Sequence, residues 1–85
     1  MAYTTKRYKG TTYMVEVYDD KDNLVEKEYY PKHLFSLKDV FKKLKGREQD
    51  CEIYEVRFSK KLNRYKQIPN GIMCSWDGNA WVTYL

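Results

Sequence analysis

The chain has 85 residues, of which 42% are hydrophobic, 33% are charged and 16% are aromatic. Sixteen Lys and Arg residues outnumber twelve Asp and Glu residues, which gives a formal net charge of +4. This length fits one small domain over residues 1–85, and the near-average composition argues against wholesale disorder. No apolar run approaches the ~20 residues that a membrane-spanning helix needs, so we expect a soluble cytoplasmic protein with no membrane partner.

The first regular element expected is a β-hairpin. Residues 1–10 precede it as a flexible tail or a short edge strand. Apolar residues alternate over residues 12–18, which is typical of a strand, and residues 24–30 continue as a second strand. The acidic run at 19–23 between them indicates a turn, because Asp and Asn side chains bond to their local backbone.

Residues 37–45 carry the clearest helix pattern in the chain. Ser36 is placed as the N-cap residue, and Asp39 three positions later completes a capping-box arrangement. Gly46 suits the C-terminal end. One apolar stripe is formed at helical spacing by Leu37, Val40, Phe41 and Leu44. A helix this short needs a sheet beneath it.

The second half of the chain predicts four strands, at 51–58, 64–68, 72–76 and 80–85. A polar turn at 60–63 separates the first two, and Pro69-Asn70-Gly71 indicates a turn between the next two. The last pair forms a hairpin around Asp77-Gly78-Asn79.

Two registers remain open for this final hairpin. A two-residue turn places Trp81 opposite Cys74, whereas a four-residue loop places it opposite Trp76. Either way, the predicted fold class is α+β: a mainly antiparallel sheet in the order β-β-α-β-β-β-β, packed against one amphipathic helix. The opposite face of the sheet would be partly solvated and would carry Tyr residues.

Residues that could support catalysis or bind a metal are few. Cys51 and Cys74 lack C-x-x-C spacing and predict two buried thiols in a reducing compartment, with a Cys51–Cys74 bridge as the alternative. His33 is the single histidine. We interpret it as an ordinary loop residue, with a Cys–His catalytic pair as the alternative. These three residues are too widely spaced for a zinc site, and the 19–23 run lacks the Gly and Glu of a calcium loop. We therefore expect no enzyme, no metal and no cofactor.

Charge is distributed unevenly along the chain. Residues 1–10 carry +3, residues 11–30 carry −4, residues 31–50 carry +3 and residues 51–85 carry +2. An oppositely charged pair of surfaces favours oriented encounter with a charged partner. We predict an acidic interaction hairpin formed by Glu16, Asp19, Asp20, Asp22, Glu26 and Glu28.

Two basic clusters indicate a second type of partner. One lies around the end of the helix and the other around Tyr65; their members are Lys42, Lys43, Lys45 and Arg47, and Lys60, Lys61, Arg64 and Lys66. Bases interleaved with aromatic rings suit single-stranded nucleic acid. Against this, Lys outnumbers Arg twelve to four, whereas bidentate phosphate or base contacts prefer Arg.

The aromatic residues favour a protein partner. Tyr and Trp are enriched at interfaces because they bury a large area and keep a polar tip. The chain has nine Tyr residues and two Trp residues, Trp76 and Trp81, more than a small core can hold. We expect some of them to form a binding face, or a homodimer interface at a face or edge of the sheet.

The leading functional hypothesis is a small, non-enzymatic, protein-binding domain of the inhibitor or adaptor type. The abundance of Lys and Tyr and the presence of only two Ala residues indicate an AT-rich genome, such as that of a low-GC bacterium, its plasmids or its phages. Phages and other mobile elements carry such small proteins, with a host protein or defence system as the target. The alternative is a nucleic-acid-binding module that uses the basic and aromatic residues, with binding that weakens steeply with salt.

Overall fold

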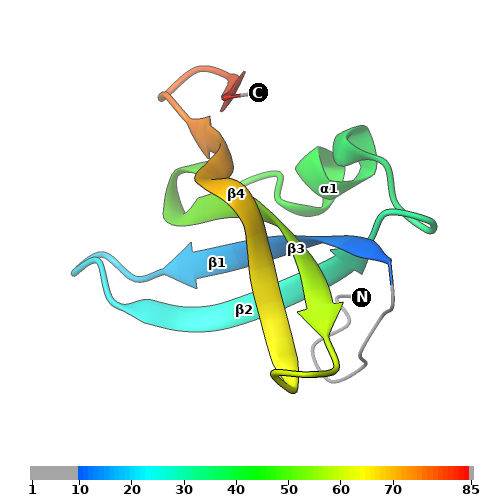
Figure 1. Ribbon diagram of the computed structural model, residues 1–85. Helices are drawn as coiled ribbons and strands as arrows, with labels where there is room; N and C mark the ends of the chain where they lie inside the picture. The colour runs from blue at the N-terminus through cyan, green and yellow to red at the C-terminus, as the bar shows by residue number, and fades with distance from the viewer. Residues whose placement is uncertain (1–9, 85) are drawn as a thin grey trace.

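The computed structural model describes residues 10–84. Its elements are β1 (Thr11–Tyr18), β2 (Leu24–Pro31), α1 (Leu37–Lys43), a 3-10 helix η1 (Glu48–Asp50), β3 (Cys51–Ser59), β4 (Arg64–Trp76) and β5 (Trp81–Thr83). The strands form one antiparallel sheet in the order β2-β1-β3-β4-β5, with α1 on one side (Figure 1). This confirms the predicted α+β class. The tail or edge strand predicted for residues 1–10 falls almost wholly outside the described residues.

The strand β4 contains both runs that were predicted as separate strands, at 64–68 and 72–76. Its pairing with β3 is interrupted midway, because Val56 pairs with Gln67 whereas Tyr54 pairs with Ile72. Counted as two segments, β4 completes the predicted order β-β-α-β-β-β-β.

The turn predicted at 69–71 was therefore wrong as a reversal of the chain. Gly71 does adopt a left-handed φ of 71°, as a turn would require, but β4 continues in the same direction. The reason is that β3, with nine residues, is long enough to pair with both halves of β4. Proline also suits a gap in a ladder, since it has no N–H to donate.

The start of α1 has the predicted capping box. The backbone N–H of Asp39 donates to Ser36 Oγ at 3.2 Å, and the backbone N–H of Ser36 donates to Asp39 Oδ2 at 2.9 Å. The helix ends at Lys43, two residues earlier than predicted, with Leu44 as the C-cap residue. Val40 and Leu44 are fully buried, so the apolar stripe of the helix packs on the sheet.

The main core lies between α1 and the sheet. Alternate side chains of β1 and β3 point to this side, and Val15 and Ile53 at its centre are both fully buried. The cluster comprises Tyr13, Val15, Tyr30, Val40, Leu44, Cys51, Ile53, Met73 and Cys74. No helix within residues 10–84 is long and apolar enough to cross a membrane.

A second, smaller core lies on the opposite face because the sheet is strongly curled. Figure 1 shows β3 and β4 crossing β1 and β2 steeply. The rings of Tyr29 in β2 and Tyr65 in β4 stack with their centroids 4.6 Å apart. Three strand spacings would separate these residues by about 14 Å in a flat sheet. The tyrosine-bearing face is thus partly closed on itself, around buried Met14, Tyr54 and Val56.

The final hairpin has the four-residue loop. The backbone N–H of Asp77 donates to the Ala80 carbonyl at 3.0 Å, and Trp76 pairs with Trp81. The backbone N–H groups of Ala80 and Asn79 both donate to Asp77 Oδ1 at 2.8 Å, and these bonds lower the pKa of the Asp77 carboxyl. This local bonding selects the register in which the two Trp residues are opposite each other.

Candidate interaction surfaces

Most of the described aromatic side chains are used in packing. Tyr13, Tyr30 and Tyr54 are buried. Tyr65 is covered by Tyr29 and also meets Phe58 edge-on, with ring centroids 5.3 Å apart. The rings at the small core are therefore engaged with each other, which leaves little free aromatic surface on this face of the sheet.

The two Trp residues attach the last hairpin to the helix. Trp81 stacks on Phe41 of α1 with ring centroids 5.0 Å apart, and Trp76 meets Trp81 edge-on at 5.6 Å. Both Trp side chains are partly buried. By contrast, Tyr84 beyond β5 is 58% exposed. Trp76 and Trp81 therefore pack the last hairpin against α1.

Glu28 differs from the other carboxylates of the predicted acidic hairpin because it is buried, at 4% exposure. Arg47 donates two hydrogen bonds to it, at 2.7 and 2.8 Å, and the Tyr30 hydroxyl donates a third at 2.7 Å. Burial alone would raise the pKa of the Glu28 carboxyl, but the bonds from Arg47 and Tyr30 outweigh it, so the pKa is lowered. Glu28 was predicted in the acidic hairpin and Arg47 in the basic cluster at the end of the helix. The ion pair between them instead stabilises the fold.

The turn of this hairpin is built by Asp19. The backbone N–H groups of Asn23 and Lys21 both donate to Asp19 Oδ1 at 2.9 Å, which lowers the pKa of the Asp19 carboxyl. Glu16 accepts a hydrogen bond from the Tyr18 hydroxyl and lies 3.8 Å from Lys27. The exposed acidic residues of the hairpin are Asp20, Asp22 and Glu26.

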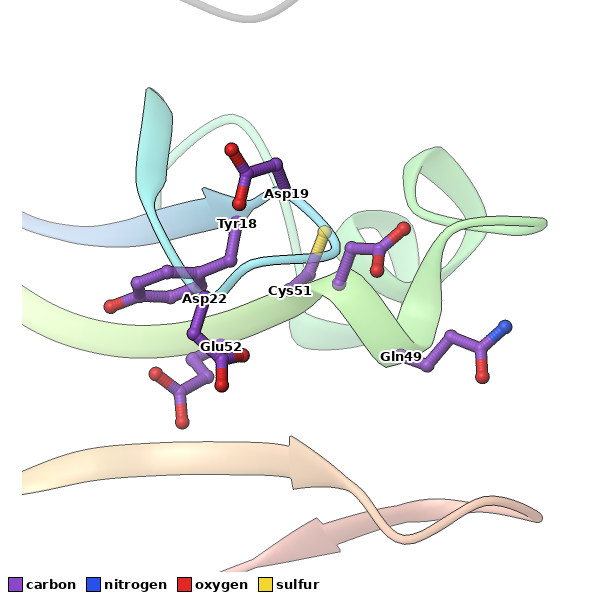
Figure 2. Close-up of a pocket in the computed structure, with 7 residues that line it drawn as sticks. Tyr18, Asp19, Asp22, Gln49, Cys51 and Glu52 are labelled. Carbon is purple, nitrogen blue, oxygen red and sulfur yellow. The ribbon is translucent and has the colours of Figure 1, made fainter.

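An acidic hollow of about 340 Å³ lies where this turn meets the start of β3. Figure 2 shows the residues that line it: Tyr18, Asp19 and Asp22 come from the end of β1 and the turn after it, and Gln49 and Glu52 come from η1 and β3. Asp50 completes the acidic lining. Within residues 10–84, no group of three His, Cys, Asp or Glu side chains is arranged to hold a metal ion. We call this end of the molecule the acidic end.

The opposite end of β3 carries a basic surface, which we call the basic tip. Arg57 pairs with Lys66, and Ser59 pairs with Arg64 across the β3–β4 hairpin. The members of the basic tip are Arg57, Lys60, Lys61, Arg64 and Lys66, all of them exposed. None makes a salt bridge within the described part of the chain. Lys42 and Lys43 are also exposed, but they lie on α1.

The acidic end and the basic tip are separated by the length of β3. Cys51 at its start pairs with Val17, next to the acidic turn, and Arg57 near its end pairs with Thr11 at the start of β1. The nine residues of β3 span about 26 Å at about 3.3 Å per residue. The strand register therefore places Asp50 and Glu52 at one end of β3 and the basic tip at the other.

The outer edge of β2 is a third surface. β2 pairs with β1 on one side and has no strand on the other side among residues 10–84. Its first four residues are all exposed, including Leu24 at 46% and Val25 at 59%. The last two residues of the strand, Tyr30 and Pro31, are buried. The sequence predicts a binding face or edge of the sheet but not which strand forms it, because local patterns do not determine strand order.

The groups considered for catalysis have different environments. His33 is exposed in the turn before α1, whereas Cys51 and Cys74 are free thiols in the main core. Burial raises the pKa of the Cys51 thiol to about 11 and also raises that of Cys74. Both thiols are therefore protonated at neutral pH, which makes them poor nucleophiles.

Comparison of the chain with protein-family models, with curated proteins and with solved structures found no match.

Proposed function

We propose that this protein is a small, non-enzymatic, protein-binding domain that pairs with an extended segment of another protein through the outer edge of β2. The observation that carries the proposal is the exposure of this edge together with Leu24 and Val25. An open strand edge is a template for one more strand: backbone hydrogen bonds give affinity, and side chains give specificity. Such a surface suits an inhibitor or adaptor, of the kind that phages and other mobile elements carry against host proteins or defence systems.

The register identifies which backbone groups face outward. The Lys32 N–H donates to the Thr11 carbonyl at 3.1 Å, and hydrogen-bonded and non-bonded pairs alternate along an antiparallel ladder. Following the β1–β2 register from this bond as far as Val17 and Glu26, where it shifts, we infer that Lys27 and Tyr29 direct their N–H and C=O groups away from β1. Pro31 also falls at an outward position, where its missing N–H costs the β1–β2 ladder nothing.

The side chains along the edge restrict the partner. Leu24 and Val25 are apolar and exposed, whereas Glu26 and Lys27 have opposite charges. Charged residues on an edge strand oppose indiscriminate pairing, and like charges directly opposite each other are unfavourable. We expect a partner strand with apolar residues facing Leu24 and Val25 and with complementary charges facing Glu26 and Lys27.

The test is affinity capture from a lysate of a low-GC bacterium, with a matched pair of variants. Lys27→Pro removes one outward N–H, while Lys27→Ala removes the same side chain and keeps that N–H. We expect the wild type and Lys27→Ala to retain the same captured protein and Lys27→Pro to lose most of it. Circular dichroism checks that all three are folded.

Equal capture by the two variants would contradict binding through the β2 edge. Each captured protein is then purified and titrated against the wild type, so that the result depends on direct, saturable binding. Sedimentation of the wild type alone shows whether a second copy of the chain occupies the edge. If the wild type forms a stable dimer and Lys27→Pro is a monomer, then the partner at the β2 edge is a second copy of this chain and not another protein.

A further inference from the structure

The basic tip ends in a two-stranded ribbon, formed where the β3–β4 hairpin continues past the start of β1. Thr11, the first residue of β1, pairs with Arg57. Further along the hairpin, Phe58 pairs with Tyr65 and Ser59 with Arg64, and no third strand accompanies them among residues 10–84. The four residues at 60–63 close the ribbon, with the backbone N–H of Leu62 donating to Ser59 Oγ at 3.3 Å.

The charge of this ribbon has one sign. The sequence contains five Lys and Arg residues and no Asp or Glu residue between positions 56 and 76. The nearest preceding carboxylate is Glu55, and Lys32 already binds it at 2.9 Å. Lys60, Lys61 and Arg64 thus lie on the two-stranded end of the hairpin, and Arg57 and Lys66 lie where β1 begins. None of the five makes a salt bridge within residues 10–84.

We propose that the basic tip binds nucleic acid, with its five cations contacting the phosphates of a duplex. This surface is separate from the β2 edge and adds a second ligand to the proposed function. A polyanion with a groove is complementary to a protruding cationic ribbon in both charge and shape. Duplex DNA provides both, because its major groove is about 12 Å wide and admits a two-stranded β-ribbon, with one phosphate charge per about 1.7 Å of axis.

This mode of binding differs from the one predicted from the sequence, in which a single strand stacks its bases on aromatic rings. The expected stacking of bases on Tyr65 is disfavoured, because Tyr29 covers that ring and Phe58 meets it edge-on. The contacts that remain are ionic. Contacts to phosphates position a protein without reading sequence, so the binding should be independent of base sequence and strongly dependent on salt.

The test measures fluorescence anisotropy with the full chain and labelled duplex DNA of about 20 base pairs, between about 50 and 200 mM salt. Five phosphate contacts predict a slope of log Kobs against log salt of about −4.5. The double variant Lys60→Gln/Lys61→Gln should reduce the magnitude of this slope by about 2 and weaken binding at low salt.

The matched control is Lys42→Gln/Lys43→Gln on α1, which removes the same two charges at a different place. We expect it to keep the wild-type slope, and two duplexes of unrelated sequence should bind equally well. A second variant, Arg57→Gln/Lys66→Gln, repeats the test on the strands of the ribbon. Urea unfolding confirms that every variant is folded.

Three results would overturn the inference. Equal losses in the tip variant and the helix variant would show that net charge alone is responsible. Tighter binding of a polyglutamate peptide than of the duplex would identify an acidic protein as the ligand. Single-stranded DNA of the same length that binds more than tenfold tighter than the duplex would exclude docking in a groove. All three measurements are independent of the capture experiment on the β2 edge.

Discussion

Replacing Arg47 with Met should destabilise the protein strongly, because it leaves the Glu28 carboxylate buried without its main partner. Breaking a fully buried ion pair costs about 3–5 kcal/mol. The Glu28 side chain is only 6% exposed, but that of Arg47 is 36% exposed, so water can reach part of the vacated site. Because water screens part of the site, we expect Arg47→Met to lower the free energy of unfolding by about 2–3 kcal/mol. That is a large share of the about 4–13 kcal/mol expected for a domain of this size.

The measurement is urea unfolding at pH 7, followed by circular dichroism, with Lys32→Met as the matched control. The control removes a cation from the Lys32–Glu55 pair, whose side chains are 41% and 20% exposed, and we expect it to cost less than about 1 kcal/mol. In thermal unfolding, Arg47→Met should lower Tm by about 10–20 °C.

The pH dependence provides a second check on the same reasoning. The folded-state pKa of Glu28 is lowered, so the stabilisation from the pair is present above the pKa of the unfolded chain and is lost as pH falls through the folded pKa. The difference between the wild type and Arg47→Met should therefore shrink below about pH 4. A loss under about 1 kcal/mol at pH 7, or a difference that does not change with pH, would refute the argument.

Three further predictions concern the core and the element ends. Cys51 and Cys74 are buried, so a thiol reagent should label both at least roughly 100-fold more slowly in the native protein than in urea; rapid native labelling would contradict their burial. A Cβ at Gly78 or Gly10 would meet nothing within 4 Å, but only Gly78 has a left-handed φ, of 105°. In urea unfolding, Gly78→Ala should therefore cost about 1 kcal/mol and Gly10→Ala should be neutral. Ser36→Ala removes the N-cap acceptor and should cost about 1 kcal/mol in urea unfolding; an unchanged midpoint would show that the cap is dispensable.

Features with a local cause were predictable from sequence. The capping box at Ser36 and Asp39 involves residues three positions apart, and the alternation over residues 12–18 reflects the two faces of one strand. The final hairpin was predicted except for its register. That register depends on the two hydrogen bonds accepted by Asp77, and the sequence is compatible with either loop length.

Features that depend on distant partners could not be predicted in the same way. Glu28 looks like any strand carboxylate until Arg47, nineteen positions later, is placed beside it. The stacking of Tyr29 on Tyr65 requires the curl of the whole sheet, which no local pattern encodes. Four residues of the basic tip were predicted as a cluster, but the addition of Arg57 and the separation of the tip from the acidic end follow only from the strand pairing.

The separation of charge along β3 also affects how molecules of this protein act on one another. Because the acidic end and the basic tip lie about 26 Å apart, we expect neighbouring molecules in dilute buffer to attract one another where the acidic end of one meets the basic tip of another. Salt weakens this attraction, since the screening length falls from about 30 Å at 0.01 M to about 8 Å at 0.15 M. The solubility of the protein should therefore increase with ionic strength over this range, which is the behaviour known as salting in.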